Sequence, residues 1–240
     1  MAGLNDLLSS DGKLAKPDVG RALGGSTNKD LMEDARMSLS GIWGGAILGF
    51  VLYVILIMSF TLFMASSVFF VSGVSVVAGG NTAAALKGME IFSNIVETLL
   101  SGAFMVGFMG FFLGIAQEGE ARLELLFVGF RRFWKSFGVY FLTGLFVLLW
   151  TLLLIIPGII ATFRYAMAYF IIADDEDCGP LEAIRRSKEM MKGNKWKLFC
   201  LQWRFFGWAL LATFLTFGIG YLWLIPYMQT TFAKFYEDVK

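Results

Sequence analysis

Long apolar runs alternate with short charged segments along most of this chain. Runs with at most two charged residues cover 42–64, 91–116, 137–156, 159–173, 196–217 and 221–235. The first run has 23 residues, enough for a helix to cross the roughly 30 Å hydrocarbon core of a bilayer at about 1.5 Å per residue. The pattern therefore predicts an all-α, polytopic membrane protein with about six transmembrane helices.

Two of the runs are short, and one stretch is ambiguous. The run 159–173 follows Pro157-Gly158, where we expect the chain to turn, and its helix would be only about 22 Å long. Either the bilayer thins around it, or neighbouring helices shield a turn below the far interface. The equally short run 221–235 follows the expected turn Gly218-Ile219-Gly220. Residues 65–80 are apolar but rich in small residues, and fit a helix extension or a loop near the far surface.

The charged segments between the runs have the pattern of helices that lie in the membrane interface. In 28–40, apolar residues recur on one face and Asp30 with Glu33 resembles a capping box. In 118–135, leucines and phenylalanines share one side and charged residues the other. The clearest segment begins at Gly179 as N-cap, with Pro180 at the first helical position, and stops at Gly193-Asn194.

A shift of 62 residues aligns two segments within the second half of the chain. Twelve positions match between 120–170 and 182–232, including Trp134-Lys135 with Trp196-Lys197. We therefore predict three parallel hairpin units, each an interfacial amphipathic helix followed by two spans, with boundaries 28–117, 118–178 and 179–240. Together they form a single membrane domain, 28–240, after a mobile cytosolic tail, 1–27.

The basic residues predict the orientation. In this arrangement, 17 of the 20 Lys and Arg residues fall on one side of the membrane. Because basic loops stay in the cytosol, this face and both termini are predicted to be cytosolic.

Composition agrees with the membrane and narrows the chemistry. The chain is 57% hydrophobic and 16% charged, against about 45–50% and 25% in soluble domains. It contains no His, and its two cysteines, Cys178 and Cys200, form no CxxC pair. The usual general base and commonest metal ligand are missing, so we expect no enzyme activity, no metal site and no cofactor. The net charge of +1 gives no indication of a nucleic-acid partner.

Charged residues within the runs are the candidate polar site. They are Arg164, Arg204 and Glu97. One interpretation is that each arginine extends to the interface or pairs locally for structural reasons. The alternative is that Arg164 and Arg204 face a common cavity that opens to the cytosol and attracts anions.

Further candidates lie at the predicted interface and in the first two spans. The predicted anionic-lipid face consists of Arg131, Arg132, Arg185, Arg186, Lys188 and Lys192. The expected interfacial anchors are Trp43, Trp134 and Trp196. Gly41, Gly45 and Gly49 suit close packing within the chain or between copies in a homo-oligomer, and a second close-contact face consists of Gly107, Gly110 and Gly114. The acidic cluster, residues 174–177, suits helix capping better than a divalent cation, because it lacks the spacing of a calcium loop.

Three sequence pieces resemble a known family. TLLLIIPGIIATFRYAMAYFIIAD, LEAIRRSKEMMKGNKWKLF and FGIGYLWLIPYMQTTFAKFYED are similar to domain-of-unknown-function family 975. The resemblance covers roughly 30–240 and is strongest in 120–240; Arg164 stands where a small polar residue is expected. It implies a multi-span protein of the bacterial cytoplasmic membrane, related to the membrane domain beside some glycerophosphodiesterases, and implies no substrate or catalytic residue.

Two functions remain open at this stage. The first is a non-enzymatic membrane scaffold or accessory protein that engages lipids, or a membrane or cytosolic protein partner, on the cytosolic face. The second is a transporter or pore for a small, possibly anionic solute. Transporters usually carry polar, interrupted spans at mid-membrane, whereas the breaks here fall at the far turns, which favours the scaffold.

Overall fold

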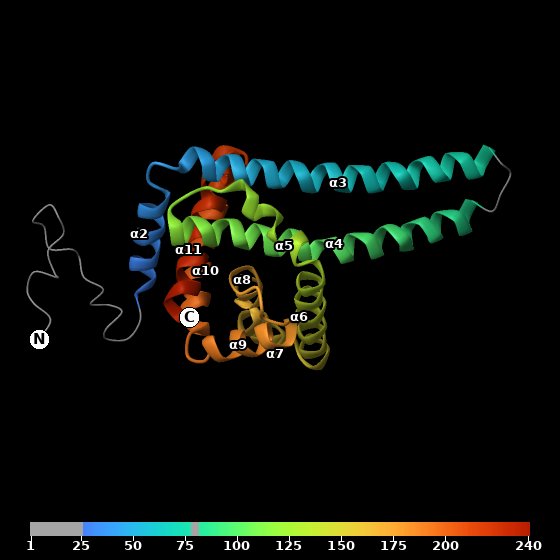
Figure 1. The fold of residues 1–240 in the computed structure, drawn as a ribbon. Helices are drawn as coiled ribbons and strands as arrows, with labels where there is room; N and C mark the ends of the chain where they lie inside the picture. Colours follow the sequence, from blue (N-terminus) through green and yellow to red (C-terminus); the bar gives the residue numbers. More distant parts are fainter. Residues whose placement is uncertain (1–25, 78–81) are drawn as a thin grey trace, which may run out of the picture.

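The computed structural model of this protein describes residues 26–77 and 82–240, which form helices joined by turns and short loops (Figure 1). The predicted tail therefore lies outside the described residues, apart from Ser26 and Thr27. In chain order the helices are α2 (Asn28–Leu39), α3 (Trp43–Val77), α4 (Thr82–Glu118), the 3₁₀ helix η2 (Leu123–Phe127), α5 (Val128–Arg131), α6 (Phe133–Leu153), α7 (Ile155–Tyr165), α8 (Ala168–Asp174), α9 (Pro180–Met190), α10 (Lys195–Thr216) and α11 (Tyr221–Val239). The all-α prediction is confirmed.

Helix α4 is the centre of the fold. It packs against α2, α3, η2, α5, α6, α8 and α11. Within the most apolar part of α4, 72% of the residues are buried inside the protein, against 6% for α3. The C-terminal half of α4 supplies the largest share of the core, including Phe111 and Phe112, which are fully buried. This helix is therefore a core element, whereas α3 keeps most of its apolar surface exposed.

Glycines allow other segments to approach α4 this closely. A methyl group added at Gly107 would collide with the backbone carbonyl of Leu126 in η2. One added at Gly114 would collide with the side chain of Leu125. The predicted close-contact face of this helix is therefore used, and its partner is a short 3₁₀ segment rather than another long helix.

Two glycines at the start of α3, Gly45 and Gly49, also pack closely against other parts of the chain. A methyl group at Gly49 would collide with the ring of Phe111, and one at Gly45 would lie 2.7 Å from the Cβ of Ala121. Gly41 has no neighbour within 4 Å of such a group and takes a positive φ of 87° at the turn before α3.

The hairpin of α3 and α4 is longer than a bilayer requires. Residues 65–77 continue α3 as a helix, which decides between the two expectations for this stretch. The apolar stretches Trp43–Val74 and Leu86–Glu118 have 32 and 33 residues, or about 50 Å each as helices, against a hydrocarbon core of about 30 Å. In Figure 1 this hairpin extends far beyond the other helices.

Five helices among the described residues are long and apolar enough to cross a membrane. The sixth predicted span forms a helix, α11, but is not one of the five. Its second half carries polar and charged residues that pack against α2 and α4. In Figure 1 α6 runs across the direction of the α3–α4 hairpin, and the far ends of the three hairpins lie at separate edges of the molecule. The side-by-side arrangement of three repeated units stays a prediction.

The turn before the fourth span lies earlier than predicted. Leu154 has extended backbone (φ −160°, ψ 143°) and caps α7, so Pro157 falls in the first turn of the helix. Proline is tolerated there because the first N–H groups of a helix have no partner within it. The span Ile155–Asp174 therefore has 20 residues, about 30 Å, and is not short.

The three surface segments differ from one another. Helix α2 is capped by Thr27 with Asp30, one turn before the predicted pair, and its buried face consists of Leu31, Ala35 and Leu39 as predicted. Residues 118–135 form η2 and α5 rather than one interfacial helix, because the carbonyls of this segment fit against α4 glycines. Helix α9 starts with Gly179 as N-cap and Pro180 at its first position, as predicted.

Candidate functional site

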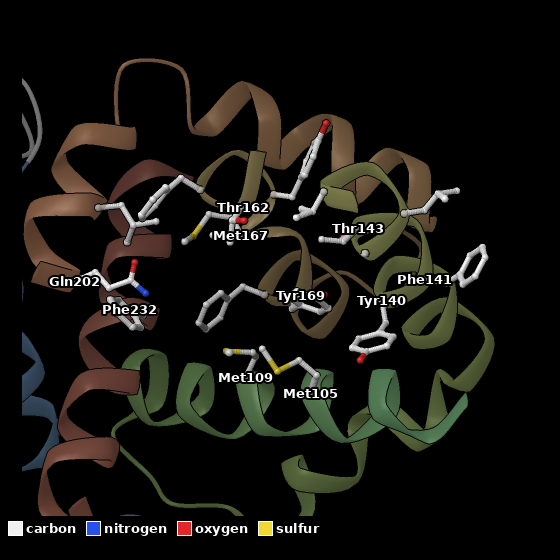
Figure 2. Close-up of a pocket in the computed structure, with 18 of the residues that line it drawn as sticks. Met105, Met109, Tyr140, Phe141, Thr143, Thr162, Met167, Tyr169, Gln202 and Phe232 are labelled. Carbon is white, nitrogen blue, oxygen red and sulfur yellow. The ribbon is translucent and has the colours of Figure 1, made fainter. Parts of the chain in front are cut away.

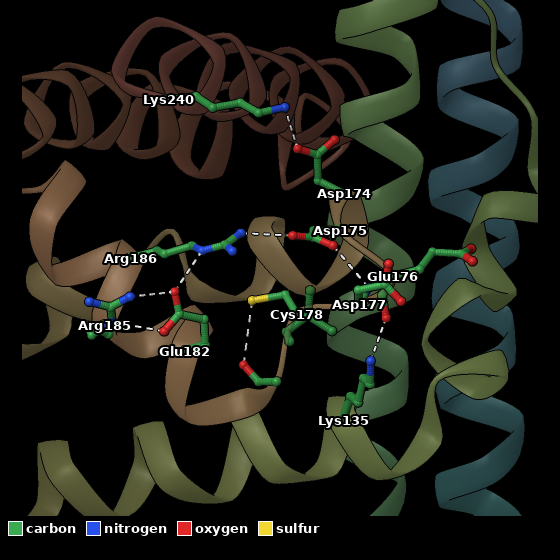
Figure 3. Close-up of polar contacts among 12 residues, drawn as sticks. Lys135, Asp174, Asp175, Glu176, Asp177, Cys178, Glu182, Arg185, Arg186 and Lys240 are labelled. Atoms are coloured by element: carbon green, nitrogen blue, oxygen red, sulfur yellow. Dashed lines mark hydrogen bonds and ion pairs between the residues drawn. The ribbon is translucent and has the colours of Figure 1, made fainter.

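Ion pairs join the ends of several helices around the acidic cluster (Figure 3). Asp174 at the end of α8 pairs with Lys240 (2.5 Å), and Asp175 pairs with Arg186 of α9 (2.8 Å). Glu176 pairs with Arg132, between α5 and α6 (2.5 Å). We call these three pairs, with Lys197–Asp238 described below, the ionic layer. It borders a polar hollow of about 730 Å³ that Tyr236 and Glu189 also line.

The acidic cluster therefore does not cap α9, contrary to the prediction. No side chain forms a capping hydrogen bond at the N-cap Gly179, and Asp174, Asp175 and Glu176 form ion pairs with basic side chains instead. Hydrogen bonding to Arg186 lowers the pKa of Asp175, and hydrogen bonding to Arg132 lowers the pKa of Glu176. Within 26–77 and 82–240, no group of three or more His, Cys, Asp or Glu residues is arranged to hold a metal ion.

Arg132 connects three elements through one side chain. Its guanidinium donates to the carbonyls of Ile172 (2.6 Å) and Ala173 (3.1 Å), in addition to its pair with Glu176. The last carbonyls of a helix have no partner within it, so the guanidinium satisfies and electrostatically complements the C-terminal end of α8. Lys135 adds a bond to the carbonyl of Glu176 (2.5 Å).

The end of α11 is held in the same way. The Asp238 side chain, only 5% exposed, pairs with Lys197 at the start of α10 (2.6 Å) and accepts a bond from the backbone N–H of Ser26. Burial by itself raises the pKa of Asp238, but the bonds from Lys197 and Ser26 outweigh it and hold the pKa below its usual value. One turn earlier in α11, Lys234 donates to the carbonyl of Ala116 (2.6 Å).

Ser187 attaches α9 to a helix break. The fourth span is interrupted between α7 and α8, where Ala166 and Met167 lie outside both helices. The buried Ser187 hydroxyl accepts from the N–H of Met167 (3.2 Å) and donates to the carbonyl of Arg164 (3.0 Å). A side chain from the surface helix thus completes the hydrogen bonding of the span.

The predicted anionic-lipid face divides into two groups. Arg132, Arg185 and Arg186 are engaged with acidic side chains; Glu182 binds both Arg185 and Arg186, and this hydrogen bonding lowers its pKa to about 2. Exposed basic side chains that point away from the core are Arg131, Lys188 and Lys192. Of the expected anchors, Trp134 and Trp196 are 76% and 71% exposed, whereas Trp43 is half-buried and packs against the core.

A cavity of about 720 Å³ lies between α4, α6, α7, α8, α10 and α11 (Figure 2). Its walls are mainly apolar, with methionines at 105, 109, 167 and 228 and several aromatic rings. Polar groups are few, and they include Thr143 of α6, Gln202 of α10 and Gln229 of α11. In Figure 2, Thr143 and Gln202 lie on opposite sides of the methionine and aromatic side chains.

The three predicted intramembrane charges do not line this cavity. Phe163 and Tyr165 line it but the half-buried Arg164 between them does not, and its Nε is buried without a hydrogen-bond partner. Arg204 is exposed on α10, and the half-buried Glu97 lies beside the lining residue Thr98. The structure therefore does not bring Arg164 and Arg204 together in the cavity described here.

Sequence reasoning missed Ser187, the capping role of Arg132 and the polar wall of the cavity. Ser187 had a local signal, since it is the one hydroxyl on the apolar face of α9, between Ile184 and Met191. Arg132 was identified only as part of a basic face. Thr143 and Gln229 had no signal that separated them from other polar residues at helical positions.

Five candidate spans place this chain in the class of helical membrane proteins, with surface segments tied to the span ends by an ionic layer. Within that class, the chain belongs to the family described as "Protein of unknown function (DUF975)", whose model matches residues 26–159 and 151–240. No curated protein and no solved structure matches the chain. The resemblance found in the sequence is thereby confirmed.

Proposed function

We propose that this protein is a non-enzymatic scaffold or accessory protein of the bacterial cytoplasmic membrane. The ionic layer supports this proposal. It joins the C-terminal ends of α8 and α11 to α9 and to the starts of α6 and α10. Such cross-linking holds a polar face in one shape, which suits the presentation of a binding surface. In this proposal the face is cytosolic, as are both termini, and the hairpins enter the bilayer from it.

The ligand of this face is proposed to be anionic lipid or an acidic protein partner. The carboxylates of the layer are occupied internally, which leaves Lys188 of α9 and Lys192, two residues after that helix, as exposed basic side chains. Each basic residue near an anionic membrane surface contributes about 1 kcal/mol. Trp196, four residues after Lys192, is exposed, and its side chain suits the headgroup region of a bilayer.

Transport of a small solute is the second candidate, and the cavity between the helices is the observation that favours it. None of the described residues that line the cavity is charged, so the cavity does not suit an anionic solute. The breaks that the structure shows also lie at helix ends or under α9, where Ser187 fills one of them.

Lipid enrichment tests the proposal. The wild type, Lys188→Gln/Lys192→Gln and Lys87→Gln are extracted from bacterial membranes directly into nanodiscs, and the anionic lipid retained with each is measured. We expect the double variant to lose enrichment by roughly fivefold per lysine. Lys87→Gln, an exposed charge on the predicted far side, serves as control and retains the wild-type value. Equal enrichment in all three would contradict lipid engagement by α9.

A flux measurement separates the two candidates. Purified protein in vesicles of phosphatidylethanolamine and phosphatidylglycerol is tested with a panel of labelled small solutes. A scaffold gives no flux above that of protein-free vesicles. Saturable flux of any solute would contradict the scaffold proposal and identify the protein as a transporter.

A further inference from the structure

We propose that the cavity between α4, α6, α7, α8, α10 and α11 binds a single-chain lipid with an uncharged, hydroxyl-bearing head. This site is separate from the basic face of α9, and the inference goes beyond the proposed scaffold function. It rests on the size of the cavity, the absence of charge among its lining residues, the buried and unpartnered amide oxygen of Gln229, and the opening of the cavity between candidate spans.

The size and walls of the cavity suit a hydrocarbon chain. Its volume of about 720 Å³ lies within the roughly 300–1,000 Å³ of ligand pockets. Methionines from three regions of the chain, among them Met105, Met167 and Met228, share the wall with phenylalanine and tyrosine rings. Methionine side chains are flexible and polarisable, so this wall can adapt to a chain of variable shape.

The lining excludes a charged head group. The residues that line the cavity are apolar, or are neutral tyrosine, threonine and glutamine. A buried ion without a counter-charge carries a large desolvation cost. The charged residues next to lining residues in the sequence, Glu97, Arg164 and Lys197, are themselves outside the lining. A fatty acid anion or a sulfate ester therefore lacks a partner here.

One polar atom indicates what the head must offer. The Gln229 Oε1 is buried without a hydrogen-bond partner, whereas the Thr143 hydroxyl lies beside Tyr169. Such unpartnered atoms are rare in folded proteins, where most buried polar groups are paired. An amide oxygen only accepts hydrogen bonds. A ligand hydroxyl meets this requirement, because it can donate to the Gln229 oxygen.

The cavity can be reached from the bilayer. Phe141, Leu145 and Leu148 of α6 line it and are also exposed on the outer surface. Their helix is one of the five candidate spans. The opening therefore lies on a surface that a membrane-inserted α6 presents to lipid, and the ligand enters from the bilayer rather than from water.

Native mass spectrometry with matched amphiphiles tests the site. The purified full chain in a non-ionic detergent is titrated with oleyl alcohol, oleyl sulfate or 1-octadecene, which differ in their heads. We expect oleyl alcohol to bind at least tenfold more tightly than either of the others, because the alkene leaves the buried Gln229 oxygen unpaired and the sulfate buries a charge. Equal binding of alcohol and alkene, or tighter binding of the sulfate, would overturn the proposal.

Three variants locate the binding. Gln229→Leu keeps the side-chain size and should weaken the alcohol several-fold while leaving the alkene unchanged. Gly144→Leu adds a side chain at the cavity wall and should weaken both, whereas Gly207→Leu on α10, outside the lining, should weaken neither; an added methyl group has no neighbour within 4 Å at either glycine. Alcohol binding unchanged in Gln229→Leu and Gly144→Leu would reject the site. A variant is interpreted only if it is monodisperse and melts as the wild type does. Lipid enrichment on α9 is measured separately, so either proposal can fail alone.

Discussion

Ser187 and Asp238 show how single buried polar groups hold this membrane protein together. Each sits where two elements distant in the sequence meet, and each is bonded on more than one side. Removing one partner of a buried hydrogen bond leaves the other partner with no hydrogen bond to water or protein. This costs more free energy of folding than the bond itself contributes. Stability should therefore be sensitive at these positions and tolerant at exposed serines and aspartates.

Replacing Ser187 with alanine should destabilise the protein by about 1–3 kcal/mol. The substitution leaves the N–H of Met167 and the carbonyl of Arg164 without their partner in a buried helix break. The measurement is the temperature at which the detergent-solubilised protein loses its monodisperse elution peak. Ser66→Ala, at an exposed serine bonded to its own helix, is the control and should change stability by less than about 0.5 kcal/mol. A Ser187 variant as stable as that control would show that the break needs no support from α9.

The Asp238–Lys197 pair predicts a pH dependence. Because the pKa of Asp238 is lowered in the folded protein, the pair stabilises the fold above the usual aspartate pKa of about 3.9. This contribution is lost as the pH falls through the lowered pKa of the folded state. Asp238→Asn should therefore melt below the wild type at pH 7, and the difference should shrink below about pH 4. The exposed Asp177→Asn is the control; a difference for Asp238→Asn that is constant with pH would exclude the pair as its source.

At the scale of elements, glycines decide which segments can pack on α4. The same side of this helix accepts the backbone of η2 at Gly107, while Gly129 of α5 lies against the carbonyl of Ala103. These contacts are between backbones, so no side-chain rearrangement can make room for a methyl group. They also explain why segment 118–135 forms the short helices η2 and α5 against the core rather than one continuous helix.

Gly107→Ala should therefore be destabilising, by about 1–3 kcal/mol or more, because the added methyl group meets the carbonyl of Leu126. Gly144→Ala, at a helical glycine with free space around it, should be neutral or should stabilise by up to about 1 kcal/mol through helix propensity. Both are measured by thermal unfolding in the same detergent. Equal effects of the two substitutions would mean that close packing at Gly107 is not required.

At the scale of the whole molecule, one buried helix and one polar face organise three hairpins. The α4 core holds α3, α6, α8 and α11, and the ionic layer ties the starts of α6 and α10 to the ends of α8 and α11. In Figure 1 the far ends of the hairpins lie apart from one another. If the polar face is cytosolic, as proposed, the two exposed entry tryptophans belong on the same side of the membrane.

Cysteine labelling tests that arrangement. In a background with Cys178→Ala and Cys200→Ala, single cysteines replace Trp134, Trp196 or Phe217, which are all largely exposed. A membrane-impermeant thiol reagent should label positions 134 and 196 only from the cytosolic side, and position 217 only from the other side. Labelling in detergent, where all three sites should react, is the control. Entry positions labelled from opposite sides would exclude the repeated-hairpin arrangement.

The sequence by itself determined the features that depend on neighbouring residues. The helical class, the presence of five apolar spans, the start of α9 at Gly179-Pro180 and a turn at Gly218-Ile219-Gly220 follow from hydrophobic runs and from backbone preferences of Gly and Pro. These are local properties, because a helix satisfies its own backbone hydrogen bonds and each apolar run is long enough to form one.

Only the tertiary structure decided which elements meet. It placed α4 at the centre, paired the acidic cluster with Arg132, Arg186 and Lys240, and filled the break after Arg164 with Ser187. It also enclosed a cavity whose polar atoms, on Thr143 and Gln229, come from residues far apart in the chain. Each of these contacts joins segments distant in the sequence, and hydrophobic patterning specifies which residues are buried but not which partners they meet.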